Sequence, residues 1–437
     1  MPITSKTLTA GGGESGIEVG HAGRTAAGTR RLRVLYQAGP GDVAGTFRHW
    51  RAGRDDPRLL AIAYSRQFFD ACLELDAEAL VITSHGGAGE HEVADERFRI
   101  IDRPVPWVQA GGLRFHLGRL AYGLTLAWHA RRFKADVALI NTGTHWFALS
   151  VLALLGVAVV PTLHNTFWPA GHRPDGWASR WLHRLNGWFW RRVATATVCV
   201  SPECVRQIEA IAGRPRGPVI QVWAPYRRET FADLPTPPPL DAGPCRVLYA
   251  GRIERSKGVF GLLDVAEQLH RQHPGRFQWD VCGDGTAIEE LAAGQRQRGL
   301  GNVFHLHGQL DAQALRQMYG RCHVVVVPTT AGFTEGLNKV AVEAVLAGRP
   351  VVTSAVSHAV DVLGEAVVEV PAEDWAAFRQ AIERLALDAP WYESRRAACR
   401  AVRAPFFDPQ RHWAAAVKQV LADAAAARGL APPMPER

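Results

Sequence analysis

The stretch RVLYAGRIERSKG at residues 246–258 joins an apolar run to a glycine-containing turn and the start of a helix. Residues 246–250 are apolar after the first arginine, which is typical of a strand buried on both faces of a parallel sheet. Gly251 opens the turn, where backbone N–H groups at a helix start can bind an anion. Arg252 and Lys257 add positive charge to the same turn. The stretch therefore predicts a βα unit that binds a phosphorylated ligand.

The same alternation of strand and helix continues after this stretch. Apolar runs predict strands at 277–282, 302–306, 323–327 and 350–353. Helical periodicity predicts helices at 258–272, 286–298, 311–320, 338–347 and 373–387. Short apolar strands separated by helices indicate a parallel sheet that is covered by helices on both faces.

An equivalent series precedes it. The predicted strands are 32–38, 79–83, 97–101, 136–141, 157–163 and 195–200, and the predicted helices are 59–75, 113–133, 145–155 and 175–192. Between the two series, residues 225–244 carry three consecutive prolines and indicate a linker. We therefore expect an α/β protein with two Rossmann-like, doubly wound parallel-sheet domains facing a central cleft. Ligands of such sheets bind beyond the carboxyl ends of the strands.

A chain of 437 residues is longer than one hydrophobic core supports. The predicted segments are a leader at 1–30, a first domain at 31–224, the linker at 225–244, a second domain at 245–405 and a C-terminal segment at 406–437. The leader is rich in Gly, Ser and Thr without an apolar run, so we expect disorder rather than a signal peptide. In the C-terminal segment we expect a helix that crosses back to the first domain, followed by a tail.

The composition favours a cytoplasmic protein with an anionic ligand. None of the seven cysteines forms a Cys-x-x-Cys pair, which fits a reducing compartment. The uncharged run 146–163 contains Gly156 and Pro161, so we interpret it as a helix, a turn and a buried strand rather than a membrane span. The net charge is +8, and no nucleic-acid-binding signature is present. Of the 50 basic residues only five are lysine, so a genome biased toward arginine codons is one explanation of the charge. If a partner explains it, nucleotide diphosphates and anionic lipids are the better candidates.

The most informative motif in the second series is EGLNKVAVEA at 335–344. A helix begins near Leu337, so its N-terminal amides can face a phosphate or a sugar hydroxyl. Glu335 and Glu343 lie on either side of this helix start, and each carboxylate can accept hydrogen bonds from hydroxyl groups. Two weaker signals are GDG at 283–285 and HGQ at 307–309, both after predicted strands.

Taken in order, GRIERSKG, CGDG, HLHG, VVPT and EGLNKVAVEA resemble glycosyltransferase family 4, the retaining group 1 enzymes of the GT-B fold. The resemblance is dense over 245–355 and thinner through the first domain. It implies an enzyme that moves a sugar from a nucleotide-sugar donor to a saccharide or polyprenyl-linked acceptor, in exopolysaccharide or cell-surface glycan synthesis. It also implies no metal and no cofactor beyond a UDP- or GDP-linked substrate.

The resemblance also assigns roles to residues of this chain. The catalytic set is Arg252, Lys257, His164 and Glu335, and the donor-binding set is Gly251, Gly283, Gly308, Gly336, Leu337, Asn338, Glu343, Gly39 and Gly41. Arg252 and Lys257 would bind the donor diphosphate. Glu335 would contact donor-sugar hydroxyls, and Glu343 would hold the nucleotide ribose. The leaving phosphate itself would help to deprotonate the acceptor, so no protein nucleophile is needed.

In the first domain, His164 follows the strand predicted at 157–163 and resembles a histidine that lies near the donor sugar. The turn Gly39-Pro40-Gly41 resembles the family's Gly-rich loop, but Pro40 lacks a backbone N–H. We expect Gly45 to supply the missing contact. Loops 39–56 and 166–176 are the expected acceptor-specificity segments.

The segment 177–193 permits two interpretations. Trp177, Trp181, Leu185, Trp188 and Phe189 share one helical stripe, and arginines occupy much of the remaining surface. The stripe either packs on the sheet, as in a crossover helix, or lies on an anionic membrane surface. The second interpretation predicts peripheral association with the inner face of the plasma membrane.

Two other functions remain open at this point. The chain could be another GT-B enzyme, such as a sugar-nucleotide epimerase or an inverting transferase. It could instead be a catalytically silent nucleotide-sugar-binding partner of another transferase. The pairing of Glu335 and Glu343 with Arg252 and Lys257 favours the retaining transferase over both.

Overall fold

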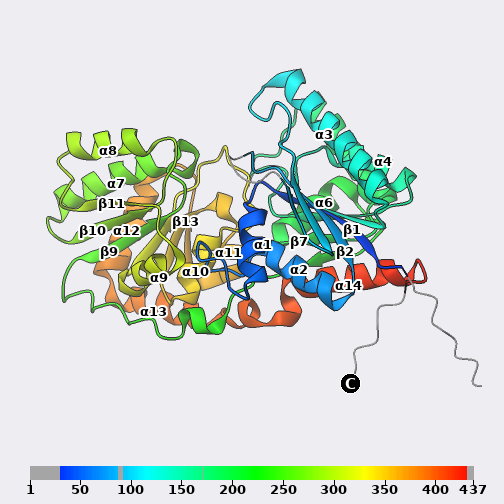
Figure 1. Cartoon of the computed structure of the whole chain (residues 1–437). Helices are drawn as coiled ribbons and strands as arrows, with labels where there is room; N and C mark the ends of the chain where they lie inside the picture. The colour runs from blue at the N-terminus through cyan, green and yellow to red at the C-terminus, as the bar shows by residue number, and fades with distance from the viewer. Residues whose placement is uncertain (1–29, 87–91, 170, 431–437) are drawn as a thin grey trace, which may run out of the picture. The chain divides into compact units, whose positions relative to one another are not determined.

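The computed structural model describes residues 30–86, 92–169 and 171–430. The predicted leader, apart from Arg30, and the tail at 431–437 lie outside the described residues. From Arg31 onward the described residues belong to one compact unit that contains two β-sheets (Figure 1). The expected α/β architecture with two parallel-sheet halves is therefore confirmed.

The first sheet has the strand order β3-β4-β2-β1-β5-β6-β7-β8 and is parallel except for the pair β3 and β4. Its strands are β1 Arg33–Gly39, β2 Glu78–Thr83, β3 Glu92–Ala94, β4 Phe98–Asp102, β5 Val137–Ile140, β6 Ala158–Leu163, β7 Thr197–Cys199 and β8 Val219–Gln221. The accompanying helices are α1 Val43–Arg51, α2 Tyr64–Glu74, α3 Gly112–Phe133, the short turn η1 Trp146–Leu149, α4 Ser150–Leu154, α5 Trp177–Arg192 and α6 Pro202–Ala212.

The second sheet has the order β11-β10-β9-β12-β13-β14 and is parallel throughout. Its strands are β9 Cys245–Ala250, β10 Phe277–Cys282, β11 Phe304–Gly308, β12 Val324–Val327, β13 Val351–Ser354 and β14 Val367–Val370. Its helices are α7 Val259–Gln272, α8 Ile288–Gln297, α9 Ala312–Arg321, α10 Lys339–Leu346, α11 Val360–Leu363, α12 Trp375–Leu387 and α13 Ala389–Ala401. Short 3-10 turns are η2 Arg228–Phe231, η3 Arg255–Lys257, η4 Ala355–Ser357, η5 Gly364–Ala366, η6 Ala404–Phe407 and η7 Pro409–Arg411.

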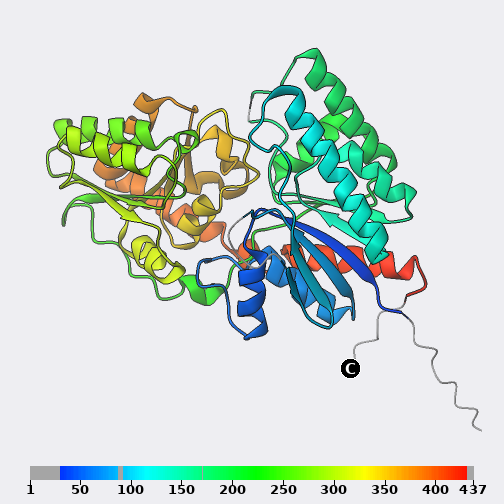
Figure 2. The ribbon, with the colours of Figure 1, turned by 45° about the horizontal axis from the view of Figure 1, so that its top comes forward.

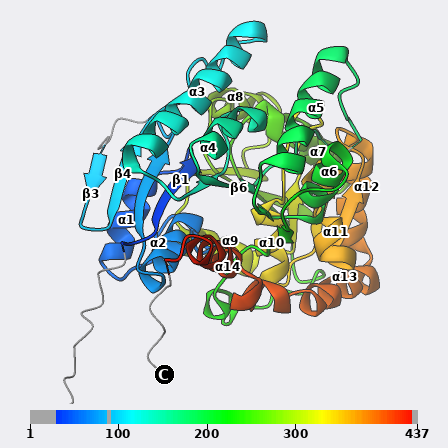
Figure 3. The same ribbon diagram turned by 90° about the vertical axis from the view of Figure 1, so that its right-hand side faces the viewer.

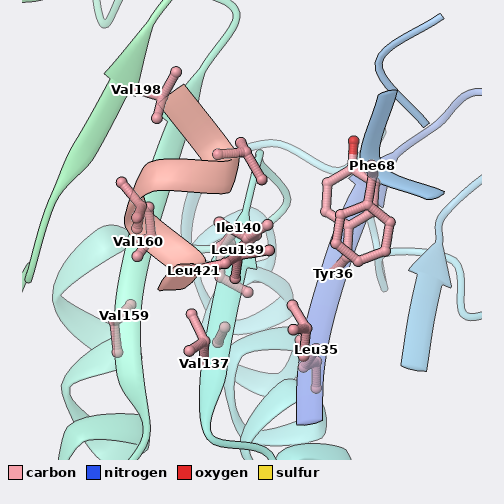
Figure 4. Packing of buried hydrophobic residues seen from close by; sticks show 14 of the residues in the cluster. Leu35, Tyr36, Phe68, Val137, Leu139, Ile140, Val159, Val160, Val198 and Leu421 are labelled. Atoms are coloured by element: carbon pink, nitrogen blue, oxygen red, sulfur yellow. The ribbon is translucent and has the colours of Figure 1, made fainter. Parts of the chain in front are cut away.

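The last helix, α14 (Trp413–Ala426), packs against α2 and the first sheet. Its residues Trp413, Val417 and Leu421 belong to the same apolar cluster as the strands β1, β5 and β6. Figure 4 shows Leu421 beside Leu139 and Ile140 of β5. The chain therefore returns to its first half after completing the second sheet.

Among the segments that differ from the sequence predictions, two lead to the first-sheet side of the molecule's ligand-binding edge. The helix predicted at 59–75 begins only at Tyr64, because Ile62 donates its backbone N–H to the Pro225 carbonyl at 3.0 Å and is held against the linker segment. Half of the loop expected at 39–56 is instead the helix α1. The Asp42 side chain caps this helix by accepting the N–H of Gly45 at 2.8 Å, a common arrangement at helix starts. Gly45 therefore does not offer the free donor that we expected.

Candidate functional site

A cavity of about 940 Å³ is lined by residues from both sheets. From the first sheet, residues 39–43 follow β1 and residues 164–167 follow β6. From the second, Arg252 and Lys257 follow β9, and residues 333–335 and 337–340 lie where the chain enters α10. All these segments follow the carboxyl ends of parallel strands, which is the usual ligand-binding edge of such sheets.

Eight of the thirteen site residues predicted from the sequence line this cavity, and five do not. Those that line it are Arg252, Lys257, His164, Glu335, Leu337, Asn338, Gly39 and Gly41. Those that do not are Gly251, Gly283, Gly308, Gly336 and Glu343.

Lys257 and Glu335 form an ion pair in the cavity wall, with Nζ 3.1 Å from Oε1. The Glu335 carboxylate also accepts the side-chain N–H of Asn338 at 2.9 Å and the hydroxyl of Thr329 at 3.3 Å. Lys257 Nζ lies 3.6 Å from the centroid of the Phe333 ring, close enough for a cation–π contact. Both charged side chains are about seven-eighths buried, at 13% and 12% exposure. Such a pair is held in one geometry and keeps hydrogen-bonding capacity toward the cavity.

Arg252 lies on the same wall but is more exposed. Its guanidinium forms an ion pair with Glu254 at 2.7 Å, and its backbone carbonyl accepts the hydroxyl of Tyr249 at 2.7 Å. The Tyr249 contact anchors the backbone of the turn, while the Arg252 side chain is 59% exposed.

The glycines behind this wall hold the turns after β9, β10 and β11 together. Gly251 and Gly283 have φ of +154° and +140°, which favours glycine, and a Cβ at Gly283 would lie 1.8 Å from the Gly251 carbonyl oxygen. The Gly283 N–H donates to the Gly308 carbonyl at 2.7 Å. These three predicted donor-binding glycines thus meet one another. Their contacts with a donor stay a prediction.

Glu343 is buried and does not line the cavity. Its two carboxylate oxygens accept the hydroxyls of Tyr226 and Tyr319 at 3.2 and 3.0 Å. Burial raises the pKa of Glu343 to about 7, although the tyrosine hydrogen bonds and Lys339 act in the opposite direction. In this structure both oxygens are thus engaged by tyrosines, and the contact with a ribose stays a prediction.

His164 joins the two halves at the cavity. Its carbonyl oxygen faces Gly336, and its ring meets Tyr64 edge-on with 4.5 Å between centroids. Its Nε2 has no hydrogen-bond partner among the described residues. Burial, and then the charge of Lys339, lower the pKa of His164 to about 3. The imidazole is therefore neutral at physiological pH.

Several cavity residues were missed by the sequence reasoning. Lys339 Nζ lies 5.0 Å from the Tyr64 ring centroid and has no carboxylate within ion-pair distance among the described residues. The sequence does mark Lys339 as a candidate site residue, because it is one of only five lysines in the chain and lies inside the EGLNKVAVEA motif. Arg119, from α3, also lines the cavity, and its Nε has no hydrogen-bond partner in the described part of the chain.

A second missed group lies on the first-half wall. Arg58 binds Asp56 at 2.6 Å and Asp42 at 2.8 Å, and the Thr46 hydroxyl donates to Asp56 at 2.9 Å. Burial alone would raise the pKa of Asp56, but the hydrogen bonds from Arg58 and Thr46 outweigh it and bring the pKa to about 2. No motif in the sequence marks this group, because its members meet only through the fold of residues 42–58.

The sheet-packing interpretation of the α5 stripe is wrong for four of its five residues. Trp177, Trp181, Leu185 and Trp188 are exposed, whereas Phe189 is buried. The face that packs inward is formed by Asn186, Gly187, Phe189 and Trp190. The spacing i, i+3, i+4 within this second set accounts for its burial.

One cluster outside the cavity has ligand atoms that could reach a metal. The ligand atoms of Glu203, His358 and Asp361 lie within 4.8 Å of one another, and none of these residues lines the cavity. Arg206 forms ion pairs with both carboxylates, so a cation already neutralises them.

Two family models match the chain. The model described as glycosyl transferases group 1 matches residues 244–388, and the model described as a glycosyl transferase 4-like domain matches residues 61–225. A glycogen synthase from Mycobacterium tuberculosis is 30% identical over 300 residues, which cover 66% of this chain and 68% of that protein. The chain belongs to the group 1 glycosyltransferases of family 4. A D-inositol 3-phosphate glycosyltransferase from Arthrobacter sp. is 29% identical over 224 residues, which cover 48% of the chain described here and 51% of the Arthrobacter protein.

Solved structures place this glycosyltransferase in the GT-B fold. Anabaena HepE in complex with UDP matches with a TM-score of 0.60 and 16% identity, over 91% of this chain and 100% of that chain. A sucrose-phosphate synthase from Thermosynechococcus elongatus matches with a TM-score of 0.63 and 18% identity over the same shares. Among the residues that the structure describes, none of the helices of this transferase has both the length and the apolar character needed to cross a bilayer.

Proposed function

We propose that this glycosyltransferase is a retaining enzyme that moves a sugar from a UDP- or GDP-linked donor to a saccharide or lipid-linked acceptor. The observation that carries the proposal is the Lys257–Glu335 pair, 3.1 Å apart in the wall of a cavity shared by both sheets. A cation for the diphosphate and an acid for sugar hydroxyls thus lie next to each other. The HepE structures, which contain UDP or UDP-glucose, support a donor of this class.

The proposed roles follow from charge and position. Lys257 and Arg252 neutralise the departing diphosphate, which lowers the energy of the transition state. Glu335 accepts hydrogen bonds from donor-sugar hydroxyls, and Asn338 and Thr329 hold it in place. The departing phosphate takes the acceptor proton, so the chain supplies no nucleophile.

We also propose that the reaction needs no metal or cofactor, because the two cations supply the positive charge that the diphosphate requires. His164 is neutral, so it would pack near the sugar and form one hydrogen bond there without adding charge. Unchanged turnover in EDTA supports this part of the proposal. Loss of turnover that Mg²⁺ restores contradicts it.

For the acceptor, we propose a growing saccharide or a polyprenyl-linked sugar in exopolysaccharide or cell-surface glycan synthesis. The exposed tryptophans of α5 support peripheral association of residues 177–193 with the inner face of the plasma membrane. An acceptor carried on a lipid would then be reached from the membrane surface.

The test is a thermal-shift panel of UDP-, GDP- and ADP-sugars. The donor should raise the unfolding temperature, since it binds the folded state. The shift should be smaller for Lys257→Ala than for wild type. Product analysis by NMR then gives the anomeric configuration. Inversion, or a donor-induced shift without any transfer, would contradict the proposal.

A further inference from the structure

The first half exposes an unusual amount of apolar surface on two helices. Sixteen large apolar residues are exposed in the described part of the chain, and twelve of them lie between Trp107 and Trp188. Five of the twelve are tryptophans, at positions 107, 128, 177, 181 and 188. Soluble monomers rarely leave a large contiguous apolar patch in water, and such patches mark binding surfaces.

The exposed residues follow helical spacing on both helices. On α3 they are Leu113, Leu117, Leu124 and Trp128, and on α5 they are Trp177, Trp181, Leu185 and Trp188. Both helices pack against η1 and project at the same end of the first sheet (Figures 2 and 3). We define these eight residues with their two helices as the α3/α5 surface.

The charge of the chain is concentrated in the same region. Residues 107–192 contain ten Lys or Arg and two Asp, so their formal charge is 10 − 2 = +8, equal to the +8 of the whole chain. None of these ten basic residues forms an ion pair with a carboxylate among the described residues. Arginine and tryptophan adjoin on both helices, since Arg132 and Arg184 lie 5.4 and 5.5 Å from the Trp128 and Trp181 ring centroids.

We propose that α3 and α5 together form a docking surface for an anionic lipid bilayer. Tryptophans settle at the headgroup level, apolar side chains enter the acyl boundary, and unpaired arginines attract acidic headgroups. Charge favours a bilayer over a second copy of this chain, because self-association would bring two sets of unpaired cations together. This inference rests on the proposed membrane association of residues 177–193 and extends it to α3.

The helix α3 also contributes a residue to the cavity. Arg119 belongs to α3 and lines the cavity, while Leu117 and Leu124 of the same helix belong to the exposed surface. A lipid-linked acceptor could therefore keep its tail in the bilayer while its head group reaches the cavity. Docking would thus supply the substrate as well as anchor the protein.

The experiment is sedimentation of the full chain with vesicles in low salt, without donor or acceptor. Wild type should sediment with vesicles of phosphatidylcholine and phosphatidylglycerol, and much less with phosphatidylcholine alone. The α5 variant W177S/W181S and the α3 variant L124S/W128S should each weaken binding by about tenfold or more. The charge variant R180E/R184E should do the same.

Two controls carry equivalent changes elsewhere on the surface. L73S/L387S replaces exposed leucines outside the α3/α5 surface, and R400E reverses an exposed arginine on α13. Both should bind vesicles as wild type does. Donor-induced thermal shifts should be unchanged in all these variants, which separates this inference from the donor site.

Three outcomes overturn the proposal. Wild type could fail to sediment with anionic vesicles, or the α3 variant could bind as tightly as wild type. Alternatively, the protein could self-associate without lipid in a way that both helix variants abolish, which would assign the surface to a second copy of the chain.

Discussion

The carbonyl oxygen of His164 lies against Gly336, so close that a Cβ atom at position 336 would be 2.3 Å from it. The same Cβ would be 2.9 Å from a methyl group of Val200. Alongside, the Thr166 hydroxyl donates to the Glu335 carbonyl at 3.3 Å. The segment after β6 and the segment before α10 therefore touch backbone to backbone, and the cavity depends on this contact.

Gly336→Ala should separate these two segments. Overpacking of this kind costs about 1–3 kcal/mol, and displacement of Glu335 should slow transfer as well. Calorimetry and initial rates measure the two effects. Gly332→Ala is the matched control, since a Cβ there has no neighbour within 4 Å. Equal stability and equal rates for the two variants would show that the contact does not matter.

Lys257→Met should lower kcat by about 10²–10³, because it removes charge stabilisation of the leaving diphosphate while keeping much of the side-chain volume. The control is Arg255→Ala, which changes the same turn at a side chain that pairs with Glu290 and is 70% exposed. Steady-state kinetics with the identified donor measures both. If the Lys257→Met variant keeps the wild-type kcat, Lys257 takes no part in the reaction.

Glu343→Gln should change how stability depends on pH. The folded pKa of Glu343 is about 7 against an ordinary value of 4.5, so folding takes up a proton between these values. Its contribution to stability is complete below about pH 4.5 and is lost as pH rises through 7, by roughly 3 kcal/mol in total. Glutamine cannot ionise, so the free energy of unfolding of the variant should increase relative to that of wild type between pH 5 and pH 8.

Denaturant unfolding at several pH values measures this difference. Glu289→Gln, at an exposed position on α8, is the control and should follow wild type throughout. A Glu343→Gln curve parallel to wild type across this range would mean that the carboxylate is already ionised at pH 5.

Asp56→Asn should change the pH dependence of stability in the direction opposite to Glu343→Gln. The folded pKa of Asp56 is about 2, below its ordinary value of 3.8. Its contribution of roughly 2 kcal/mol is therefore present above about pH 4 and is lost as pH falls through 2. The variant should be less stable than wild type at pH 7, and this difference in stability should become smaller as the pH falls toward 2.

Asp55→Asn provides the comparison for Asp56→Asn, since Asp55 is half exposed and pairs with Arg227 at 3.1 Å. A surface pair of this kind contributes about 0–1 kcal/mol. If both asparagine variants lose equal stability at pH 7, the ion pair of buried Asp56 with Arg58 contributes no more than the exposed pair of Asp55.

The apolar runs were sufficient to predict most of the sheet strands, because a strand buried on both faces needs a continuous apolar run. They failed for β3, β8 and β14, which have three, three and four residues and are not fully buried runs. The helix α1 was missed because its start depends on Asp42 capping Gly45, and residues 39–56 lack a clear apolar period.

The two-sheet architecture and the motif residues of the turn after β9 could be predicted from the order of the amino acids, because strand burial and turn chemistry depend on neighbours along the chain. Three features could be seen only in the folded chain: His164 meets Gly336, Glu343 lies between two tyrosines, and the α5 stripe faces outward. Each of these depends on residues far apart in the chain, and helical spacing defines a stripe without saying which side of the helix meets the sheet.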